Sequence, residues 1–332
     1  MNNISIPLSY TTHSKSDFVF PRPPPTPGQY PAPILTKVDT VPDRPKNWRL
    51  WWISDNVRNH LIAMLGEFIG TLSFLFFSLT AVQTANNKAD TLPRADLLST
   101  SPSLLQISYI SFSFGISLMV NVWVFYRVSG GMFNPAVTFG LCFAGAVPWI
   151  RGALLVPTQM LAGVVASGLV SGLFPGDLKA QVNTSAGVSV SQGLFIEMIL
   201  TAELVFTILM LAVENHRGSF LAPLGIGLAL LLAHLIGINF TGACLNPARG
   251  FGPDLILGDF KGYHWIYYIG PLLGAALAAL LYKLLKYLEY TTCNPDQDDD
   301  GLDVYRVIAG RTHSKLNRRS SIESFSSQAP LA

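Results

Sequence analysis

Six long apolar segments, separated by short polar stretches, dominate the chain between residues 60 and 286. Each holds about 18–23 residues, close to the length that a helix needs to cross the hydrocarbon of a bilayer. Six such runs leave too little polar surface to cover them in a soluble protein, so we predict an all-α membrane protein with six transmembrane helices. The predicted spans are His60–Val82, Leu104–Tyr126, Gly152–Phe174, Leu194–Val213, Leu221–Ile238 and His264–Lys286.

The tripeptide Asn-Pro-Ala occurs twice, after the second and after the fifth apolar segment. Asn caps a helix N-terminus and Pro fits the first helical position, so each tripeptide predicts a short helix, over 134–144 and 246–256. The Asn side-chain oxygen accepts from the first turn, and its NH2 group is expected to stay free as a donor. One such tripeptide would be an ordinary cap, but two at matching places are not explained as caps alone. The residues concerned are Asn134, Pro135, Ala136, Asn246, Pro247 and Ala248.

The two halves of the chain repeat one another. Glu67 in the first span and Glu197 in the fourth lie in similar surroundings, and each half holds three spans and one Asn-Pro-Ala. Three is an odd number, so the second repeat must be inverted in the membrane. Inverted repeats with half-helices that meet at the midplane are typical of transport proteins. The fold class predicted is six transmembrane helices plus two re-entrant half-helices, whose positive dipole ends face one another.

Composition and charge exclude several classes of protein. The chain of 332 residues is 50% hydrophobic and 13% charged, with a mean hydropathy of +0.39. A net charge of +2 without a basic stripe gives no reason to expect nucleic acid as a partner. The three cysteines have neither metal-ligand spacing nor a disulfide pattern, so no metal or cofactor is expected. No nucleophile–base pair appears, so an enzyme is not predicted, and the polar start of the chain holds no signal peptide.

Lysine and arginine set the expected orientation. Placing both tails in the cytosol puts most of these residues there, including Arg127, Arg151 and Arg217 of the short loops. We therefore expect a multi-pass integral membrane protein of the plasma membrane, with both termini cytoplasmic. The proline-rich stretch 1–58 and the stretch 290–332 are predicted to be disordered tails around a channel domain over 59–289.

The chain resembles the aquaporins of the major intrinsic protein family, in their orthodox water-channel branch and of fungal type. Besides the two Asn-Pro-Ala motifs, the resemblance rests on the stretches Gly66-Glu67-Phe68, Asn246-Pro247-Ala248-Arg249 and His264-Trp265-Ile266-Tyr267-Tyr268-Ile269-Gly270-Pro271. The resemblance implies a homotetramer in a lipid bilayer, in which each protomer has its own pore.

The resemblance also implies a selectivity filter of Phe114, His234, Ala243 and Arg249. Phe114 lies 20 residues before Asn134, and His234 lies 12 before Asn246. Taken alone, His234 would be read as a core histidine and Phe114 as a core or lipid-facing residue. Arg249 is a permanent cation at membrane depth, which is costly unless it lines water or has a partner.

The predicted function is a passive, osmotically driven water channel that excludes ions and protons. The alternatives are an aquaglyceroporin-like facilitator of glycerol, hydrogen peroxide or other small neutral solutes, and a weakly conducting membrane junction protein. Glu67 and Glu197 are expected to brace the re-entrant loops by hydrogen bonds. Gln159 and Glu203 are expected to give similar buried polar support.

Four further residues are candidates for regulation or modification. Ser129 follows Arg127, Ser321 lies in a basophilic kinase pattern, and Asn183 begins a glycosylation sequon in a predicted outer loop. Tyr30 stands between prolines in the N-terminal tail. One hypothesis is that this tail lowers conductance and that phosphorylation of Ser129 relieves the block. The alternative is a tail that matters only for trafficking.

Overall fold

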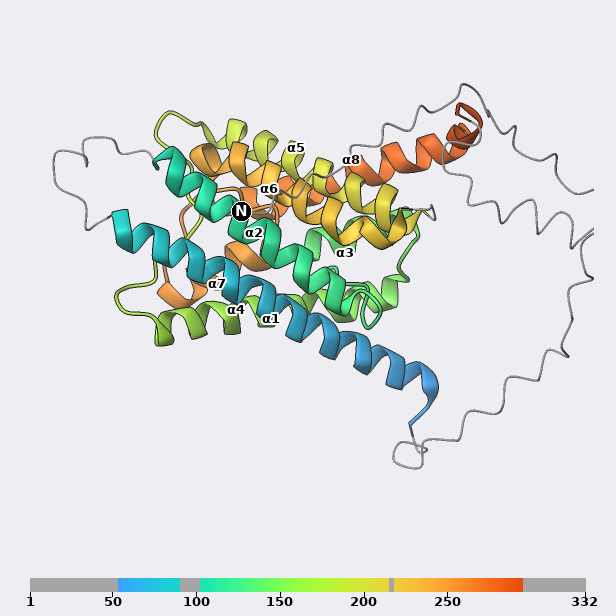
Figure 1. Cartoon of the computed structure of the whole chain (residues 1–332), viewed down its shortest axis with the longest axis horizontal. Helices are drawn as coiled ribbons and strands as arrows, with labels where there is room; N and C mark the ends of the chain where they lie inside the picture. The colour runs from blue at the N-terminus through green and yellow to red at the C-terminus, as the bar shows by residue number, and fades with distance from the viewer. Residues whose placement is uncertain (1–52, 90–101, 215–217, 295–332) are drawn as a thin grey trace, which may run out of the picture. The chain divides into compact units, whose positions relative to one another are not determined.

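The computed structural model describes residues 53–89, 102–214 and 218–294. Within these ranges every regular element is helical, and six helices are long and apolar enough to cross a membrane by length and composition (Figure 1). The predicted all-α fold with six membrane-length helices is therefore confirmed. The long helices are α1 (Asp55–Ala89), α2 (Leu104–Phe125), α4 (Trp149–Leu173), α5 (Val190–Ile208), α6 (Ala222–Thr241) and α8 (Ile266–Tyr287).

Two short helices interrupt this series at the predicted positions. They are α3 (Pro135–Ala144) and α7 (Pro247–Leu257), each of which begins at the proline of an Asn-Pro-Ala motif. Single turns complete the fold: η2 (Leu209–Val213) prolongs α5, η3 (Ser219–Leu221) precedes α6 and η4 (Tyr290–Thr292) follows α8.

Polar caps explain where several helices begin. The Ser103 hydroxyl accepts from Gln106 N at 3.1 Å at the start of α2. At the start of α5, Ser189 and Gln192 form a reciprocal capping box, with the Gln192 side chain accepting from Ser189 N at 2.9 Å. This box moves the start of α5 four residues ahead of the predicted Leu194.

The largest difference from the predicted boundaries is in α1, which runs to Ala89 where the apolar pattern ends at Val82. The added turns carry Gln83, Asn86 and Asn87, which share one side of the helix at spacings of three and four residues. Their side chains donate to backbone carbonyls of the loop between α4 and α5, so these polar turns have partners in the fold.

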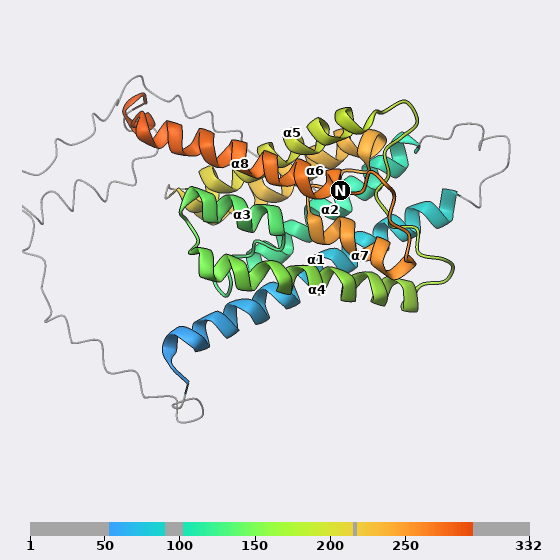
Figure 2. The same cartoon turned by 180° about the vertical axis from the view of Figure 1, so that it is seen from behind.

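The helices form two groups of matching order. The first is α1, α2, α3 and α4, and the second is α5, α6, α7 and α8. α1 packs along α4 as α5 packs along α8, and α2 packs against α6 across the two groups (Figures 1 and 2). This pairing is the arrangement expected of two equivalent halves.

Glycine allows the contact between the halves to be close. A Cβ at Gly115 of α2 would lie 2.8 Å from the Gly227 carbonyl oxygen, and a Cβ at Gly227 of α6 would lie 2.7 Å from the Gly115 carbonyl oxygen. Side chains at these two positions would force the helices apart. The α2–α6 contact is therefore a backbone-to-backbone crossing, as small residues permit in membrane helices.

The two short helices point in opposite directions. We call the end of the bundle where α1 begins the Asp55 end, and the end where α1 finishes the Ala89 end. α3 runs from the middle of the bundle towards the Asp55 end, and α7 runs towards the Ala89 end (Figures 1 and 2). Their N-termini are therefore brought together in the interior of the bundle.

Candidate functional site

The two Asn-Pro-Ala motifs cap α3 and α7 in the same way. Asn134 Oδ1 accepts from Ala136 N at 2.8 Å and from Val137 N at 3.4 Å. Asn246 Oδ1 accepts from Ala248 N at 2.9 Å. Both asparagines are buried, with 5% and 4% of their surface exposed. Each amide is thus oriented by the first turn of its own helix.

The motifs also bind one another. Asn134 Nδ2 donates to Leu245 O at 2.9 Å, and Asn246 Nδ2 donates to Phe133 O at 2.9 Å. The expectation that each NH2 group stays free is therefore wrong in part, because one of the two N–H groups of each amide is bound to the other motif. An amide NH2 carries two donors, so each asparagine keeps one N–H beyond this cross-link. The reciprocal pair joins the two half-helix N-termini.

In the first half, the Glu67 carboxylate gathers the loop before Asn134. Glu67 Oε1 accepts from Ser129 Oγ at 2.7 Å and from Met132 N at 3.0 Å, and Oε2 accepts from Phe133 N at 2.8 Å. Gln159 Nε2 of α4 donates to Oε2 at 2.8 Å. Glu67 and Gln159 are both fully buried. The carboxylate oxygens thus satisfy backbone N–H groups that no helix satisfies.

In the second half, the Glu197 carboxylate repeats this pattern. Glu197 Oε1 accepts from Thr241 Oγ1 at 2.6 Å and from Cys244 N at 2.9 Å, and Oε2 accepts from Leu245 N at 2.8 Å. Tyr267 of α8 donates its hydroxyl to Thr241 O at 2.9 Å. The hydroxyl and the two N–H groups stand five, two and one residues before the motif asparagine in both halves.

Both loops hold non-glycine residues in the left-handed region. Phe133 and Leu245, which precede the two asparagines, have φ of 50° and 52°, and Ala243 has φ of 50°. Such conformations cost free energy and persist where surrounding bonds impose them. Here the Glu67 and Glu197 carboxylates hold the N–H groups of these loops.

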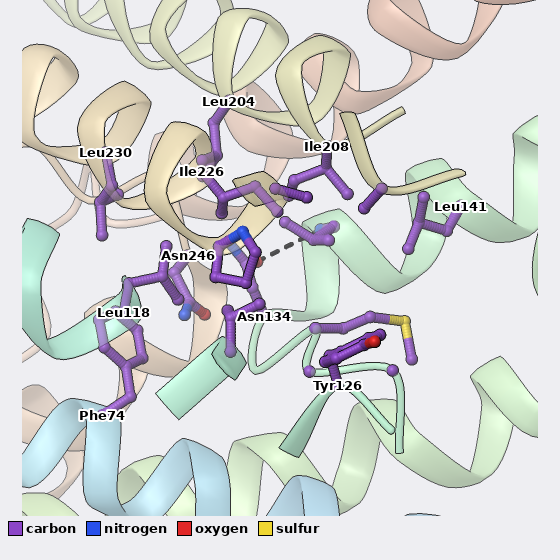
Figure 3. Close-up of a pocket in the computed structure, with 18 of the residues that line it drawn as sticks. Phe74, Leu118, Tyr126, Asn134, Leu141, Leu204, Ile208, Ile226, Leu230 and Asn246 are labelled. Carbon is purple, nitrogen blue, oxygen red and sulfur yellow. Dashed lines mark hydrogen bonds between the residues drawn. The ribbon is translucent and has the colours of Figure 1, made fainter. Parts of the chain in front are cut away.

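A cavity of about 500 Å³ runs from the Asp55 end past the motifs (Figure 3). Tyr126, which follows α2 directly, lines the cavity together with Asn134 and Asn246. The rest of the wall is mainly apolar. Its aliphatic and aromatic residues include Phe74, Leu118, Val122, Val137, Leu141, Leu204, Ile208, Ile226 and Leu230.

Phe114, His234 and Arg249, far apart in the sequence, meet in the wall of this cavity. The Phe114 and His234 rings stack with centroids 4.1 Å apart, and the Arg249 guanidinium carbon lies 5.7 Å from the Phe114 centroid. Arg249 Nη1 donates to Ala180 O at 2.8 Å. His234 Nδ1 lies 3.0 Å from Leu230 O, and its Nε2 has no partner among the described residues.

The position of Ala243 differs from that of the other three. Ala243 is fully buried and does not line the cavity, whereas its neighbour Cys244 does. The left-handed backbone of Ala243 turns the chain so that the next residue faces the interior space. Cys244 Sγ donates to Asn246 O at 3.2 Å.

Two expected roles do not fit the positions found. Glu203 is not buried support: it lies exposed on the outer face of α5. Ser129 is buried, with 7% of its surface exposed, and its hydroxyl is bound to Glu67. A kinase cannot reach Ser129 unless the loop before Asn134 first opens, so the hypothesis of a phosphorylated switch at this residue conflicts with the fold.

The remaining candidates for regulation are placed only in part. Tyr30 and Ser321 lie outside the described residues. Asn183 is exposed in the loop between α4 and α5, where Tyr263 OH lies 3.4 Å from its Oδ1. Its use as a glycosylation site stays a prediction.

Sequence reasoning missed a buried contact between an aspartate and a histidine at the Ala89 end. Asp254 Oδ2 of α7 lies 2.7 Å from His264 Nδ1, and His264 Nε2 lies 2.9 Å from Tyr268 OH. Asp254 and His264 are 1% and 5% exposed. The pair joins α7 to the start of α8. The signal available in the sequence was the acidic Asp254 inside a half-helix whose other charged residue is Arg249.

A second missed cluster surrounds Glu214 at the Asp55 end. Tyr282 and Tyr290 donate their hydroxyls to this carboxylate, and Lys286 Nζ forms a salt bridge with it at 3.1 Å. Burial alone would raise the pKa of Glu214, but these bonds outweigh it, so the pKa lies below its ordinary value. The cluster ties the end of η2 to the last turns of α8 and to η4.

The described residues hold no group of three or more metal-ligating side chains. The polar groups in contact with the cavity are amide, guanidinium, imidazole, hydroxyl and thiol groups. Such a set can bind and orient a small neutral molecule by hydrogen bonds.

The comparisons with known proteins agree with this geometry. The family profile described as "Major intrinsic protein" matches residues 55–282. The chain is 51% identical over 254 residues to a protein named Aquaporin-7 of Botryotinia fuckeliana, an alignment that covers 76% of this chain but only 56% of that relative. It is 51% identical over 256 residues to a protein named Aquaporin-1 of Gibberella zeae, with 75% and 77% of the two chains covered.

A solved structure shares the fold. The X-ray structure of the aquaglyceroporin from Plasmodium falciparum superimposes with a TM-score of 0.56, covering 68% of this chain and 95% of that one at 20% identity. An identity this low bears on the fold alone. With the profile match across most of the chain and half of all aligned residues shared with two proteins named as aquaporins, this protein belongs to the major intrinsic protein family.

Proposed function

We propose that the protein is a passive, osmotically driven water channel that excludes ions and protons. The observation that carries this proposal is the cavity of about 500 Å³, whose mainly apolar wall carries the two motif amides and, beside Phe114, the polar side chains of His234 and Arg249. A few polar groups on an otherwise apolar wall bind water by few hydrogen bonds, so water can move along the cavity without breaking many of them.

The motif asparagines would orient water at the middle of the path. Each has one N–H beyond the cross-link and can donate it to a water oxygen. The half-helices α3 and α7 add their positive N-terminal ends at the same place. A water that accepts two hydrogen bonds there does not pass a proton along the file, and cations meet a positive potential. This account is the general one for aquaporin-type pores and is not special to this chain.

The Phe114–His234–Arg249 group would select by size and charge. The stacked rings and the guanidinium come from three different elements and approach one space. Arg249 is 3% exposed and carries a permanent charge, so a cation that entered would be repelled in surroundings of low dielectric constant. A neutral molecule of the size of water would pass, and a polyol would be hindered by the aromatic pair.

Proteoliposomes test this function directly. The purified full-length protein is reconstituted and the vesicles are shrunk in a stopped-flow instrument with sucrose or with glycerol as osmolyte. We expect fast shrinkage with both, and with glycerol no fast re-swelling. Fast re-swelling would establish a facilitator of glycerol and other small neutral solutes instead. Shrinkage no faster than in empty vesicles would point to a weakly conducting junction protein.

We propose that the Asp55 end faces the cytosol of the plasma membrane, with 59–289 as channel domain and both tails inside. The arginines Arg58, Arg127 and Arg151 stand at or beside helix ends on this side of the bundle, which agrees with the positive-inside rule. Labelling of single cysteines introduced at Arg127 and Asn183 with an impermeant maleimide tests the orientation. Labelling of intact cells at the first position and not at the second would overturn it.

We also propose that the channel is a homotetramer. Glu203 lies near the middle of the span Val190–Val213, exposed on the outside of the protomer. A carboxyl group against lipid at this depth is costly, so a protein neighbour is the favoured cover. Native mass spectrometry should give four copies. A protein that stays monomeric on release from mild detergent would contradict this proposal.

A further inference from the structure

Two amide side chains of α1, Gln83 and Asn86, bind the loop between α4 and α5, and a third amide orients one of them. Gln83 Nε2 donates to Asp177 O at 2.9 Å, and Gln83 Oε1 accepts from Lys179 N at 2.7 Å. Asn86 Nδ2 donates to Lys179 O at 2.6 Å. Gln106 of α2 donates from Nε2 to Asn86 Oδ1 at 2.7 Å and so fixes the orientation of that amide. We call Gln83, Asn86 and Gln106 the amide clamp.

The clamp acts on the residue directly before Ala180. Lys179 has its N–H bound to Gln83 and its carbonyl bound to Asn86, so the peptide groups on both sides of its Cα are held. The second of these groups is the peptide bond to Ala180. Only the two backbone dihedrals of Ala180 then separate a fixed peptide plane from the Ala180 carbonyl. Ala180 is itself fully buried, which leaves these dihedrals little freedom.

The Ala180 carbonyl in turn holds Arg249. It accepts from Arg249 Nη1 at 2.8 Å, whereas Arg249 Nε has no hydrogen-bond partner among the described residues. The contact of the guanidinium with the Phe114 ring, at 5.7 Å, has no fixed hydrogen-bond direction. The position of the Ala180 carbonyl therefore sets where this cation stands beside Phe114 and His234.

We propose that the amide clamp determines solute selectivity by positioning Arg249 through the loop. Gln83 and Asn86 are positioning residues, since neither lines the cavity. The inference rests on the proposed function, because it takes the Phe114–His234–Arg249 group as the narrow part of a conducting path. Solutes affected would be small neutral molecules larger than water, such as glycerol and urea.

Burial explains why the clamp matters. Gln83 is 2% exposed, so its loss removes two buried hydrogen bonds, those with the Lys179 N–H and with the Asp177 carbonyl. A loop in this state takes other positions to regain hydrogen bonds with water, and the Ala180 carbonyl moves with it. The guanidinium then loses its anchor and occupies more than one place, which widens the opening for part of the time.

Asn87 provides a matched control on the same helix. Its Nδ2 donates to Pro175 O at 3.2 Å, which is also an amide–carbonyl bond to the same loop. Pro175 is five residues from Ala180 and precedes the clamped residue. Loss of this bond loosens the start of the loop while the Lys179 peptide groups stay held.

The experiment compares Gln83→Leu, Gln83→Glu, Asn86→Ala and Asn87→Ala with the unmodified chain in proteoliposomes. Water, glycerol and urea permeabilities are measured for each, with the amount of protein and the unfolding temperature. We expect the ratio of glycerol to water permeability to rise about five-fold or more in Gln83→Leu and Asn86→Ala, as loss of one buried hydrogen bond allows. Gln83→Glu keeps the acceptor for Lys179 N, so its permeability ratio should rise less. The ratio of Asn87→Ala should stay within about two-fold of that of the unmodified chain.

Hydrogen–deuterium exchange at the loop separates this inference from the proposed function. Exchange at Lys179 N–H and Ala180 N–H should accelerate in Gln83→Leu whether or not the protein conducts. Faster exchange with an unchanged permeability ratio would overturn the role of the clamp and leave the proposed water channel intact.

An equal rise of the permeability ratio in Asn87→Ala would also overturn the role of the clamp, because general loosening of the loop would then be enough to explain the effect. An unmodified protein that conducts no water would reject the proposed function itself. If Gln83→Leu fails to assemble, an unchanged ratio in both Gln83→Glu and Asn86→Ala refutes the inference.

Discussion

The Phe114 ring stacks on the His234 ring at a centroid distance of 4.1 Å and an interplanar angle of 28°. Phe114 comes from α2 and His234 from α6, the two helices that cross at Gly115 and Gly227. The glycine next to Phe114 brings the two backbones together, and the neighbouring aromatic side chain is thereby placed within reach of His234. Packing between the two halves of the repeat thus creates the contact that we assign to the filter.

Removing this stack should widen the filter. The double variant Phe114→Ala, His234→Gly removes both rings of the stack. Each of these side chains is 1% exposed in the unmodified protein, so their loss leaves space inside the bundle. We expect glycerol permeability to rise at least about ten-fold while water permeability stays within about three-fold, as a pocket of changed size discriminates by such factors. Stopped-flow light scattering of proteoliposomes gives both numbers. The single variant Leu161→Ala, on the exposed face of α4, is the control and should change neither permeability. An unmodified protein already equally permeable to both would remove the basis of this prediction.

Removing the charge of Arg249 should open the channel to ions. Arg249→Val deletes a buried cation and the hydrogen bond to Ala180 O. We expect proton or cation leak to appear with water flux retained, because the electrostatic barrier falls. A pH-sensitive dye inside the vesicles and a potassium diffusion potential measure it. Arg249→Lys keeps the charge and should leak less. A variant that conducts water and leaks no more than the unmodified protein would show that the barrier lies elsewhere, such as at the half-helix N-termini.

A methyl group at Gly163 should destabilise the pore. A Cβ there would lie 2.5 Å from the Ala248 carbonyl oxygen, so Gly163→Ala must push α4 away from the second motif. The expected loss is about 1–3 kcal/mol of unfolding free energy, typical of overpacking. Gly172→Ala on the same helix is the control, since nothing lies within 4 Å of its Cβ. Unfolding temperatures in detergent compare the two. Equal unfolding temperatures of the two variants would mean that α7 moves away from the added methyl group without a cost in free energy.

The Glu214 cluster should make stability depend on pH. The pKa of Glu214 is lowered in the folded protein, so the carboxylate contributes stability that is complete above the unfolded pKa. That contribution is lost as the pH falls below the unfolded pKa of about 4.3 and through the lower folded value. Glu214→Gln should therefore unfold at a lower temperature than the unmodified protein at pH 7, and the difference should shrink at pH 3. A difference that is the same at both pH values would rule out the ionised carboxylate as its source.

Much of the fold could be predicted from local pattern. Hydrophobic length set the number of spans, and Asn134 and Asn246 with their prolines marked where α3 and α7 begin, because capping depends on neighbours along the chain. The odd number of spans in each repeat required inversion, and inversion requires the two half-helices to enter from opposite ends. The register of Phe114 and His234 against the asparagines came from the family resemblance, since neither residue is distinctive by itself.

Partners far apart along the chain were decided only by the tertiary structure. Whether Glu203 is buried or exposed depends on which face of α5 the bundle covers. The position of Glu203 in the sequence does not show which face that is. The burial of Ser129 could not be predicted, because the residue that binds its hydroxyl, Glu67, lies 62 residues earlier in the chain. The polar turns with Gln83, Asn86 and Asn87 could not be predicted as part of the first long helix, because their partners lie in a loop more than 85 residues away. Apolar length, capping and repeat symmetry are properties of neighbouring residues and of order along the chain, so the sequence alone determined them. Hydrogen bonds between distant segments depend on how helices turn and cross, which only the packed bundle decides.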